Sequence, residues 1–442
     1  MERTYIKDLK EHIGKEITVA GWVDIRRDHG KLVFLDLRDM TGKVQMVALP
    51  NHAEAHAAAS AVRSEWVIEV RGIVNARPPK MVKEGVLNGD LEIEMLDAKV
   101  LAKAQELPFE LGAELNLDTY LDNLPLTLRE EKARAVFKIQ AVIIHAFRNF
   151  LVEQGFTEFQ APKLIGEDAE GGANSFNVEY FGHTAHLAQS PQLYKQIMVG
   201  VFERVFSAGN VYRAEKHSTT RHLNEYTSLD IEMGFIKDHT DVMNMENRIL
   251  AYIVKELKEK CFAEFALFDA TIPDVPEKIP AMKLRMAQEI IKKETGDDCT
   301  NEPDLEPAHE RFLCEYSKRE FGSDFIFITH FPISKRPFYT LEDEEDRGYA
   351  KGGDLLFRGV EITTLAQRIH DYDTLVQSMK NKGLDPEKFR FYLQAFKYGM
   401  PPHGGFGLGL ERLTAKFLGL ENVKQATLFP RDLNRIDNLL SE

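Results

Sequence analysis

The chain has few cysteines and lacks the apolar segments that export or membrane insertion requires. Only three cysteines occur in 442 residues, and neither their odd number nor their spacing matches a disulfide framework or a zinc site. No apolar run follows Met1, so we expect no signal peptide, and we expect no segment to span a membrane. These absences favour a cytoplasmic protein whose cysteines, Cys261, Cys299 and Cys314, are reduced thiols.

The chain also lacks the excess of positive charge that is common among proteins that bind nucleic acids. Its formal net charge is −14, from 56 basic and 70 acidic residues. Residues 1–104 carry 16 basic and 16 acidic side chains, so the whole acidic excess lies in residues 105–442. Because nucleic-acid binding depends on a local basic surface and not on the total charge, residues 1–104 are the better candidate for such a surface.

Two common nucleotide-binding motifs are absent from the glycine-rich segment 398–413. No Gly-Lys-Ser/Thr follows, which excludes a P-loop, and Leu410 stands where a dinucleotide fingerprint has its third glycine. A turn that closes a core helix explains such a segment about as well as a ligand site does. Four glycines nevertheless let the backbone approach a flat ligand closely: Gly404, Gly405, Gly407 and Gly409.

A second segment, residues 210–235, is rich in charged side chains around a predicted strand-turn-strand. It contains Arg213, Glu215, Arg221 and His222, and the spacing of the first two places them on one face of a strand. A lone arginine is usually a surface or salt-bridge residue, but several arginines on fixed elements can grip a polyphosphate. Together with Arg412, which follows the glycines, this segment favours a nucleotide site.

The first hundred residues are predicted to form a small β-barrel. Three short strands, an alanine-rich helix and two further strands follow one another, which is the order of a five-stranded OB barrel. Another small β-domain remains the alternative. The predicted strands are 16–25, 31–38, 43–48, 65–74 and 91–101, and the helix is 53–62.

The rest of the chain is predicted to alternate strands with helices. Residues 105–135 are irregular and are interpreted as a hinge between domains 1–104 and 136–442. A long amphipathic helix over 130–153 ends at Gln154-Gly155. Further helices are expected near 240–260, 281–294 and 305–320, and we find no internal repeat.

Segments 210–235 and 398–413 together resemble motifs 2 and 3 of the class II aminoacyl-tRNA synthetases. The helix 136–153 with the strand that ends at Pro162 resembles motif 1, the dimer seam of that family. The resemblance covers nearly the whole chain and is closest to the compact archaeal-type aspartyl-tRNA synthetases of subclass IIb. It implies an α+β fold with an N-terminal OB-fold β-barrel and an antiparallel-sheet catalytic domain. It also implies a homodimer that uses ATP, Mg²⁺, L-aspartate and tRNA(Asp).

The resemblance implies a role for each residue of an ATP site. Arg213 bridges the attacking carboxylate and the α-phosphate, while Tyr226 and Arg412 cover the two faces of the adenine by stacking and cation–π contact. Glu215 accepts from the adenine amino group, and the motif 2 loop holds the γ-phosphate. The expected catalytic residues are Arg213, Glu361 and Arg412, and the expected ATP site is Arg213, Glu215, Arg221, His222, Tyr226, Glu361 and Arg412.

By the same resemblance, Mg²⁺ is held by Asp354, Glu361 and Thr364, which supply the hard oxygen ligands that it prefers. The two carboxylates are seven residues apart on one apparent strand. This odd spacing places them on opposite faces, so Gly359 is expected to mark a bulge or bend. Without the resemblance, a pair of solvated edge residues would be the better interpretation.

The string Ala-Gln-Ser-Pro-Gln-Leu-Tyr-Lys-Gln over 188–196 is close to the aspartyl-enzyme signature, and asparaginyl enzymes generally lack its lysine. Lys195 and Arg368 are expected to bind the substrate's side-chain carboxylate, because two cations in one small pocket suit an anionic substrate. The expected ammonium site is Glu170, Ser190, Gln192 and Asp230. An asparaginyl-tRNA synthetase and a non-catalytic paralogue that binds RNA or a metabolite are the alternatives.

Three features bear on specificity. In the N-terminal domain, Arg26, Phe34, Gln45 and Glu92 match residues that contact the tRNA anticodon, where aromatic side chains stack on bases. The long loop 77–86 favours a relaxed enzyme that also charges tRNA(Asn). Near the active site, Leu365 and Ala366 replace two glycines that the family usually has, which adds side-chain bulk beside the pocket.

Overall fold

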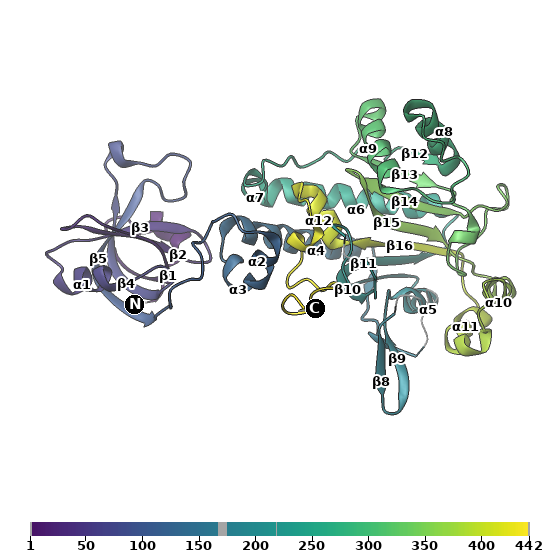
Figure 1. Ribbon diagram of the computed structural model, residues 1–442, viewed down its shortest axis with the longest axis horizontal. Coiled ribbons are helices and arrows are strands. Elements are labelled where there is room, and N and C mark those ends of the chain that lie inside the picture. Colours follow the sequence, from purple (N-terminus) through teal and green to yellow (C-terminus); the bar gives the residue numbers. More distant parts are fainter. Residues whose placement is uncertain (1, 167–174, 218, 441–442) are drawn as a thin grey trace. The chain divides into compact units, whose positions relative to one another are not determined.

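The computed structural model describes residues 2–166, 175–217 and 219–440 (Figure 1). The chain divides into two compact units, Met1–Ala113 and Glu114–Glu442. Two short helices, α2 (Leu117–Asp122) and α3 (Leu124–Thr127), lie within the stretch interpreted as a hinge. The hinge at 105–135 and the domain boundaries on either side of it stay predictions.

The first unit contains a closed five-stranded barrel with strand order β1-β2-β3-β5-β4. Three strands, a helix and two strands follow one another in the chain, which confirms the predicted OB-fold order. Strand β4 begins later than predicted because Glu65 has a left-handed φ of 65° and turns its carboxylate to Arg38 at 3.0 Å. The elements are η1 (Ile6–His12), β1 (Glu16–Asp28), β2 (Val33–Arg38), β3 (Lys43–Ala48), α1 (Ala53–Ala61), β4 (Val67–Ala76), η2 (Pro79–Met81) and β5 (Leu91–Ala102).

The second unit is built on a mixed sheet with strand order β12-β13-β14-β15-β16-β11-β10-β6. Its inner strands pair antiparallel, as predicted, whereas the edge pairs β12–β13 and β10–β6 are parallel. The strands are β6 (Thr157–Glu158), β10 (Arg204–Tyr212), β11 (Glu225–Gly234), β12 (Ala281–Lys283), β13 (Phe325–Thr329), β14 (Gly352–Phe357), β15 (Val360–Gln367) and β16 (His403–Gly409). The α+β class is confirmed.

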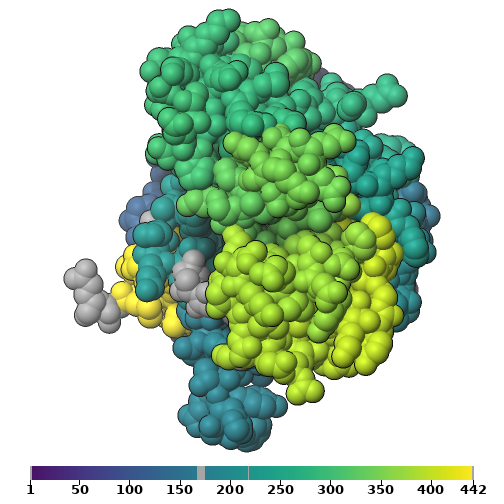
Figure 2. Space-filling view, turned by 90° about the vertical axis from the view of Figure 1, so that its right-hand side faces the viewer, coloured from purple at the N-terminus to yellow at the C-terminus, as the bar shows by residue number. Residues whose placement is uncertain are grey.

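Helices and a small hairpin sheet surround this large sheet. Strands β7 (Leu164–Ile165), β8 (Asn177–Tyr180) and β9 (His183–Leu187) form the small sheet, and β8–β9 stands out at the bottom of the unit in Figure 2. The helices are α4 (Glu131–Glu153), α5 (Gln192–Phe202), α6 (His239–Lys260), α7 (Phe262–Ala266), α8 (Leu284–Thr295), α9 (Pro307–Phe321), η3 (Ile333–Lys335), α10 (Tyr372–Asn381), η4 (Pro386–Phe389), α11 (Arg390–Lys397), α12 (Leu410–Leu418) and η5 (Val423–Ala426).

Side-chain alternation along the central strands separates a packed face from an open one. On β11, Leu229 and Ile231 are fully buried in the main core cluster with residues of α4 and α6. The intervening Ser228, Asp230 and Glu232 project from the opposite face, since successive side chains of a strand alternate. On β16 the same period places apolar side chains in the core and glycines on the open face. Local sequence pattern therefore leaves polar groups and bare backbone on one face of the sheet.

Two sequence predictions about elements were wrong. Residues 281–283 form strand β12 rather than the first turn of a helix, because they pair with β13 at the sheet edge before α8 begins. Asp354 and Glu361 do not share a strand. The chain reverses at Arg358 and Gly359, with φ of 46° and 82°, so one carboxylate lies on β14 and the other on β15. The bulge or bend expected at Gly359 is thus a tight turn between two strands.

Helix α4 corrects the expectation that no segment could span a membrane. It is long and apolar enough to do so by length and composition alone. Half of its most apolar window is buried, and Ile139, Ile143 and Phe147 are fully buried in the main core cluster. The apolar side chains on this buried side of α4 are explained by packing against α6.

The replacement of two family glycines by Leu365 and Ala366 is accommodated by glycines on both neighbouring strands. Ala366 pairs with Gly352 on β14 and with Gly405 on β16. A Cβ atom on Gly352 would lie 2.9 Å from the Ala366 Cβ, so the two positions cannot both carry side chains without a backbone shift. The added bulk is thus balanced by bare backbone across the sheet.

The buried His239, at the start of α6, should make the stability of the folded protein sensitive to acid. Burial lowers its pKa to about 4, with the facing His330 and Lys351 also lowering it and Asp238 and Asp343 opposing. Because the unfolded chain binds this proton near pH 6.5, stability is lost as pH falls from about 6.5 to about 4. Between pH 7.5 and pH 4.5, we expect the free energy of unfolding of His239→Phe to fall by up to roughly 3 kcal/mol less than that of the parent protein.

The measurement is denaturant unfolding of both proteins at the two pH values. His183→Phe, at an exposed position in the β8–β9 hairpin, is the matched control and should follow the parent protein. Parallel responses of His239→Phe and the parent protein would contradict the assignment.

Candidate active site

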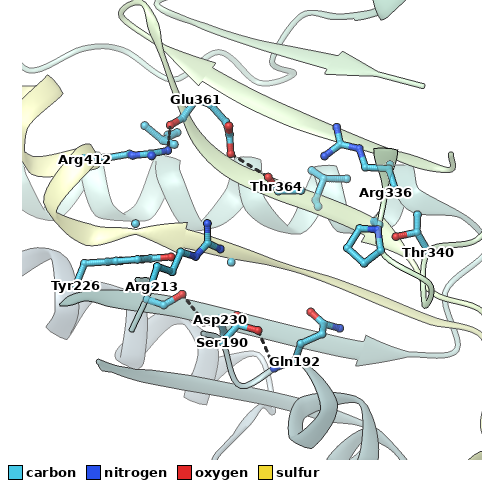
Figure 3. Close-up of a pocket in the computed structure, with 18 of the residues that line it drawn as sticks. Ser190, Gln192, Arg213, Tyr226, Asp230, Arg336, Thr340, Glu361, Thr364 and Arg412 are labelled. Atoms are coloured by element: carbon cyan, nitrogen blue, oxygen red, sulfur yellow. Dashed lines mark hydrogen bonds between the residues drawn. The ribbon is translucent and has the colours of Figure 1, made fainter. Parts of the chain in front are cut away.

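A cavity of about 260 Å³ opens on the polar face of the large sheet. In Figure 3, Arg412, Glu361, Thr364 and Arg336 lie along one side of it, and Tyr226, Arg213, Asp230, Ser190 and Gln192 lie along the other. Strands β11, β15 and β16 form its floor, and the beginnings of α5 and α12 close two of its ends. Such a concave site with converging charged groups is the usual form of a ligand-binding pocket.

One end of the cavity has the features of an adenine and phosphate site. Arg213 lies directly after β10, and its guanidinium is 5.8 Å from the ring centre of Tyr226 on β11. Glu215 also lines the cavity but belongs to the loop after β10, so its predicted place on the strand face was wrong. The strand ends at Tyr212, where the chain leaves the sheet, and Asn224 then bonds the backbone carbonyls of Arg213 and Glu215.

Arg412 connects the two motif segments by bonds to backbone. Its Nε donates to the carbonyl of Arg221 at 3.4 Å, and its Nη1 donates to the carbonyl of Glu361 at 3.2 Å. Arg221 in turn donates to Glu310 of α9 at 3.0 Å and to the carbonyl of Gly359. Burial, followed by the charge of Arg412, lowers the pKa of the neighbouring His222. The cations of this region are therefore held close together around the cavity wall.

Two carboxylates lie on the two strands of the β14–β15 hairpin, Asp354 on β14 and Glu361 on β15. Asp354 accepts two bonds from Arg336, at 2.9 and 3.2 Å, and Glu361 accepts from the Thr364 hydroxyl at 2.9 Å. Burial raises the pKa of Asp354, and the charge of Glu361 raises it further, against the lowering effect of Arg336. Two hard anionic oxygens that disfavour each other's charge fit a divalent cation. Among the described residues no group of three or more His, Cys, Asp or Glu side chains gathers at one point.

The two cations assigned to the substrate side chain are already paired. Lys195 donates to Asp230 at 2.9 Å and lies 3.5 Å from Glu232. Arg368 donates to both oxygens of Glu232, at 2.9 and 3.3 Å, and to the carbonyl of Gly405. The expectation that these cations imply an anionic substrate because they lack partners was therefore wrong. The complete burial of Glu232 acts to raise its pKa, but the charges of Arg368 and Lys195 outweigh this effect and lower the pKa.

Gly405 makes this arrangement possible. A Cβ atom there would lie 2.4 Å from a Glu232 carboxylate oxygen and 2.0 Å from the carbonyl of Ile231. Any side chain at this position would push the β11 carboxylate away from Arg368. The glycine run thus serves close approach of the backbone to buried charges on the adjacent strand.

A buried hydrogen-bond chain sets the orientation of Gln192. The carbonyl of Pro401 can only accept, so the His403 Nδ1 at 2.9 Å carries the proton and its Nε2 accepts from Gln196 at 2.9 Å. Burial lowers the pKa of His403 to about 4, which keeps the ring neutral. The Gln196 Oε1 then accepts from Gln192 at 3.0 Å and from Tyr392 at 3.1 Å. Gln192 is thereby left with its own carbonyl oxygen for the cavity, an acceptor suited to an ammonium group.

In the first unit, three of the four predicted anticodon residues share the outer face of the barrel. Gln45 donates to Glu92 at 3.3 Å, and Phe34 lies two residues before Asp36, which pairs with Gln45 across β2 and β3. Arg27 joins this cluster through Asp36 and Gln45. Arg26, adjacent to Arg27 on β1, projects from the opposite face and bonds Asp28.

Several residues that line the cavity, or that hydrogen-bond to its lining residues and their partners, escaped the sequence analysis. Glu232 could have been found, because Ser228, Asp230 and Glu232 alternate as polar residues along one strand face. Arg336, Gln196, His403 and Glu310 carried no local signal, since their partners are distant in the sequence. The predicted ammonium ligand Glu170 lies outside the described residues.

The chain matches two protein families. Residues 116–433 match the family described as "tRNA synthetases class II (D, K and N)", and residues 17–101 match "OB-fold nucleic acid binding domain". The barrel, the large sheet and its charged cavity thus define a class II tRNA synthetase.

Similar proteins show to which family within this class the chain belongs. The aspartate–tRNA(Asp/Asn) ligase of Deinococcus radiodurans is 46% identical, with 99% of each chain covered. The aspartate–tRNA(Asp) ligase of Pyrococcus abyssi is 38% identical, with 98% of each covered. The crystal structure of asparaginyl-tRNA synthetase from Pyrococcus horikoshii complexed with asparaginyl-adenylate has a TM-score of 0.89 at 32% identity, with 99% of each chain covered. The chain belongs to the aspartate–tRNA ligase family.

Proposed function

We propose that the chain activates L-aspartate with ATP and transfers it to both tRNA(Asp) and tRNA(Asn). The choice of aspartate over asparagine as substrate rests on Lys195, the lysine of the aspartyl-type string 188–196. This residue lines the cavity and is 1% exposed. The relaxed tRNA choice is supported by relatives at 46% and 47% identity that are named aspartate–tRNA(Asp/Asn) ligases.

Within this proposal, the described residues bind and orient the reactants. Ser190, Gln192 and Asp230 receive the α-ammonium group, and Lys195 with Arg368 receives the side-chain carboxylate. The substrate α-carboxylate oxygen attacks the α-phosphorus of ATP, the bond to the β-phosphate breaks, and pyrophosphate leaves. Arg213 neutralises charge on the α-phosphate, which is the main demand of such a transition state.

The nucleotide and metal are assigned to the remaining residues of the cavity. Tyr226 and Arg412 enclose the adenine, Glu215 accepts from its amino group, and Arg221 with His222 holds the γ-phosphate. Asp354, Glu361 and Thr364 would hold Mg²⁺. When bound, this ion would neutralise charge on the phosphates during transfer. The anticodon is assigned to Arg26, Phe34, Gln45 and Glu92.

The protein is further proposed to be a cytoplasmic homodimer. The support is the resemblance of α4 and β6 to the family's dimer seam. Val152 and Leu164, near the ends of this region, are 61% and 46% exposed. Light scattering coupled to size-exclusion chromatography should give twice the chain mass, and a monomer at micromolar concentration would contradict this assignment.

ATP–pyrophosphate exchange with aspartate and asparagine, side by side, tests the amino acid. Exchange with aspartate only is the expected result. Exchange with asparagine only would identify an asparaginyl enzyme, and exchange with neither substrate in a folded protein would favour a non-catalytic paralogue.

Aminoacylation of purified tRNA(Asp) and tRNA(Asn) transcripts tests the second half of the proposal. These tRNAs differ in the last anticodon base, and we expect the two kcat/KM values to lie within about tenfold of each other. The loop between β4 and β5 exposes Met81 and Val86 at 66% and 57%, so it offers apolar surface that forms no base-specific hydrogen bonds, while Phe34 provides a stacking contact that tolerates different bases. A preference for tRNA(Asp) of about a hundredfold, or about 2.7 kcal/mol, would exclude the relaxed enzyme.

A further inference from the structure

A second cavity, of about 180 Å³, adjoins the active site on the other side of Arg221 and Arg412. Both arginines also line the active-site cavity, so the two spaces share a wall. The remaining walls come from the Arg358-Gly359 turn of the hairpin, from Arg311 on α9 and from Lys416 on α12.

The lining of this cavity is strongly cationic. Among its lining residues, Glu421 is the one acidic side chain. Five lining side chains are basic: Arg221, Arg311, Arg358, Arg412 and Lys416. Two nearby carboxylates offset part of this charge, since Glu310 bonds Arg221 at 3.0 Å and Asp324 lies 3.8 Å from Arg358. The balance remains positive.

Two of these cations form no ion pair in the part of the chain that the structure describes. No hydrogen bond or ion pair is formed by the ammonium group of Lys416 or by the guanidinium of Arg311 within residues 2–166, 175–217 and 219–440. Lys416 is half-buried, and burial, with added effects of Arg221 and Arg311, lowers its pKa, whereas Cys314 and Glu310 act to raise it. Arg311 is exposed, so the cost of burying a cation without an ion pair falls on Lys416, and an anion in this cavity would offset that cost.

Arg221 is placed to act in both cavities. Its side chain is 21% exposed and donates to Glu310 and to the carbonyl of Gly359, and Gly359 lines the second cavity. In the proposed function the same arginine holds the γ-phosphate of ATP. An oligophosphate leaving the active site would therefore remain in contact with one guanidinium as it moves.

We infer that this second cavity is a transit site for inorganic pyrophosphate, the product of the activation step, held by Lys416 and Arg311 after it leaves the ATP site. The inference rests on the proposed function for the identity of the anion. No bond is made or broken in this movement. The site would lower the barrier to product release by replacing the phosphate contacts of the active site one at a time.

The test uses Lys416→Met and Arg311→Gln in the full chain. In ATP–pyrophosphate exchange with aspartate, each variant is expected to raise the KM for pyrophosphate about tenfold, because each removes one charge-assisted contact. The KM for ATP should change by less than about twofold. Lys255→Met and Arg390→Gln, at exposed positions outside both cavities, are the matched controls and should change neither value.

Titration calorimetry with inorganic pyrophosphate provides a second measurement that needs no catalysis. The parent protein should bind pyrophosphate, and each variant should bind it about tenfold more weakly. Equal increases in the KM for ATP and for pyrophosphate would mean that these cations serve the ATP phosphates, and unchanged values would mean that they bind neither. Either result would overturn the inference. Absence of exchange in the parent protein would instead count against the proposed function, while calorimetry would still decide the cavity.

Discussion

Lys195→Met is expected to reduce kcat/KM for aspartate by about a hundredfold or more, with a much smaller effect on the KM for ATP. The lysine is 1% exposed and contacts both acidic residues of β11 that lie beneath the cavity. Its removal takes away one charge-assisted bond to the substrate and leaves Asp230 without its buried partner. Breaking a buried pair in this way costs about 3–5 kcal/mol of stability.

A double variant separates these two effects. Lys195→Met combined with Asp230→Asn restores the local charge balance and should recover most of the lost stability, as measured by thermal unfolding. Activity should stay low, because both residues are assigned to the substrate. A proportional loss of apparent affinity for aspartate and ATP would show that Lys195 is only structural.

Glu361→Gln is expected to lower the rate of aspartyl-adenylate formation by about a hundredfold to a thousandfold, with little change in stability. Within the described parts of the chain, the Glu361 carboxylate forms one side-chain hydrogen bond, to Thr364, and Asp354 keeps both bonds to Arg336. Removing its charge weakens the pair of hard oxygen ligands proposed for Mg²⁺. The variant should therefore need a higher Mg²⁺ concentration for half-maximal exchange.

Asp354→Asn provides the contrast. It should also weaken the response to Mg²⁺, but it removes the carboxylate that pairs with the buried Arg336 and should lower the melting temperature as well. Glu344→Gln, at an exposed position, is the matched control and should resemble the parent protein in both measurements. An unchanged Mg²⁺ response in both Glu361→Gln and Asp354→Asn would exclude a metal site at the hairpin.

Local patterns in the sequence predicted the barrel and several residues of the cavity, and the resemblance to class II synthetases supplied the fold class. The order of short strands around one helix favoured the barrel, and the glycines of 398–413 with the charged residues of 210–235 indicated a ligand site. The polar face of β11 was recognised only in the structure, although a period of two residues could have shown it. These features depend on neighbours in the chain, so they can be inferred without tertiary structure. Motif resemblance then brought segments 210–235 and 398–413 into one site.

Only the tertiary structure decided how the charges are paired. Asp354 and Glu361 lie on neighbouring strands because the chain reverses at Gly359. Lys195 on α5 and Arg368 after β15 pair with Asp230 and Glu232 on β11. Likewise, Arg221 reaches Glu310 on α9, which lies 89 residues later in the chain. Such contacts depend on which strands become neighbours and in what register, and a local pattern holds no information about either. The sequence thus determined which charged groups this protein has on its polar face, and the packing of distant segments determined which of them neutralise one another.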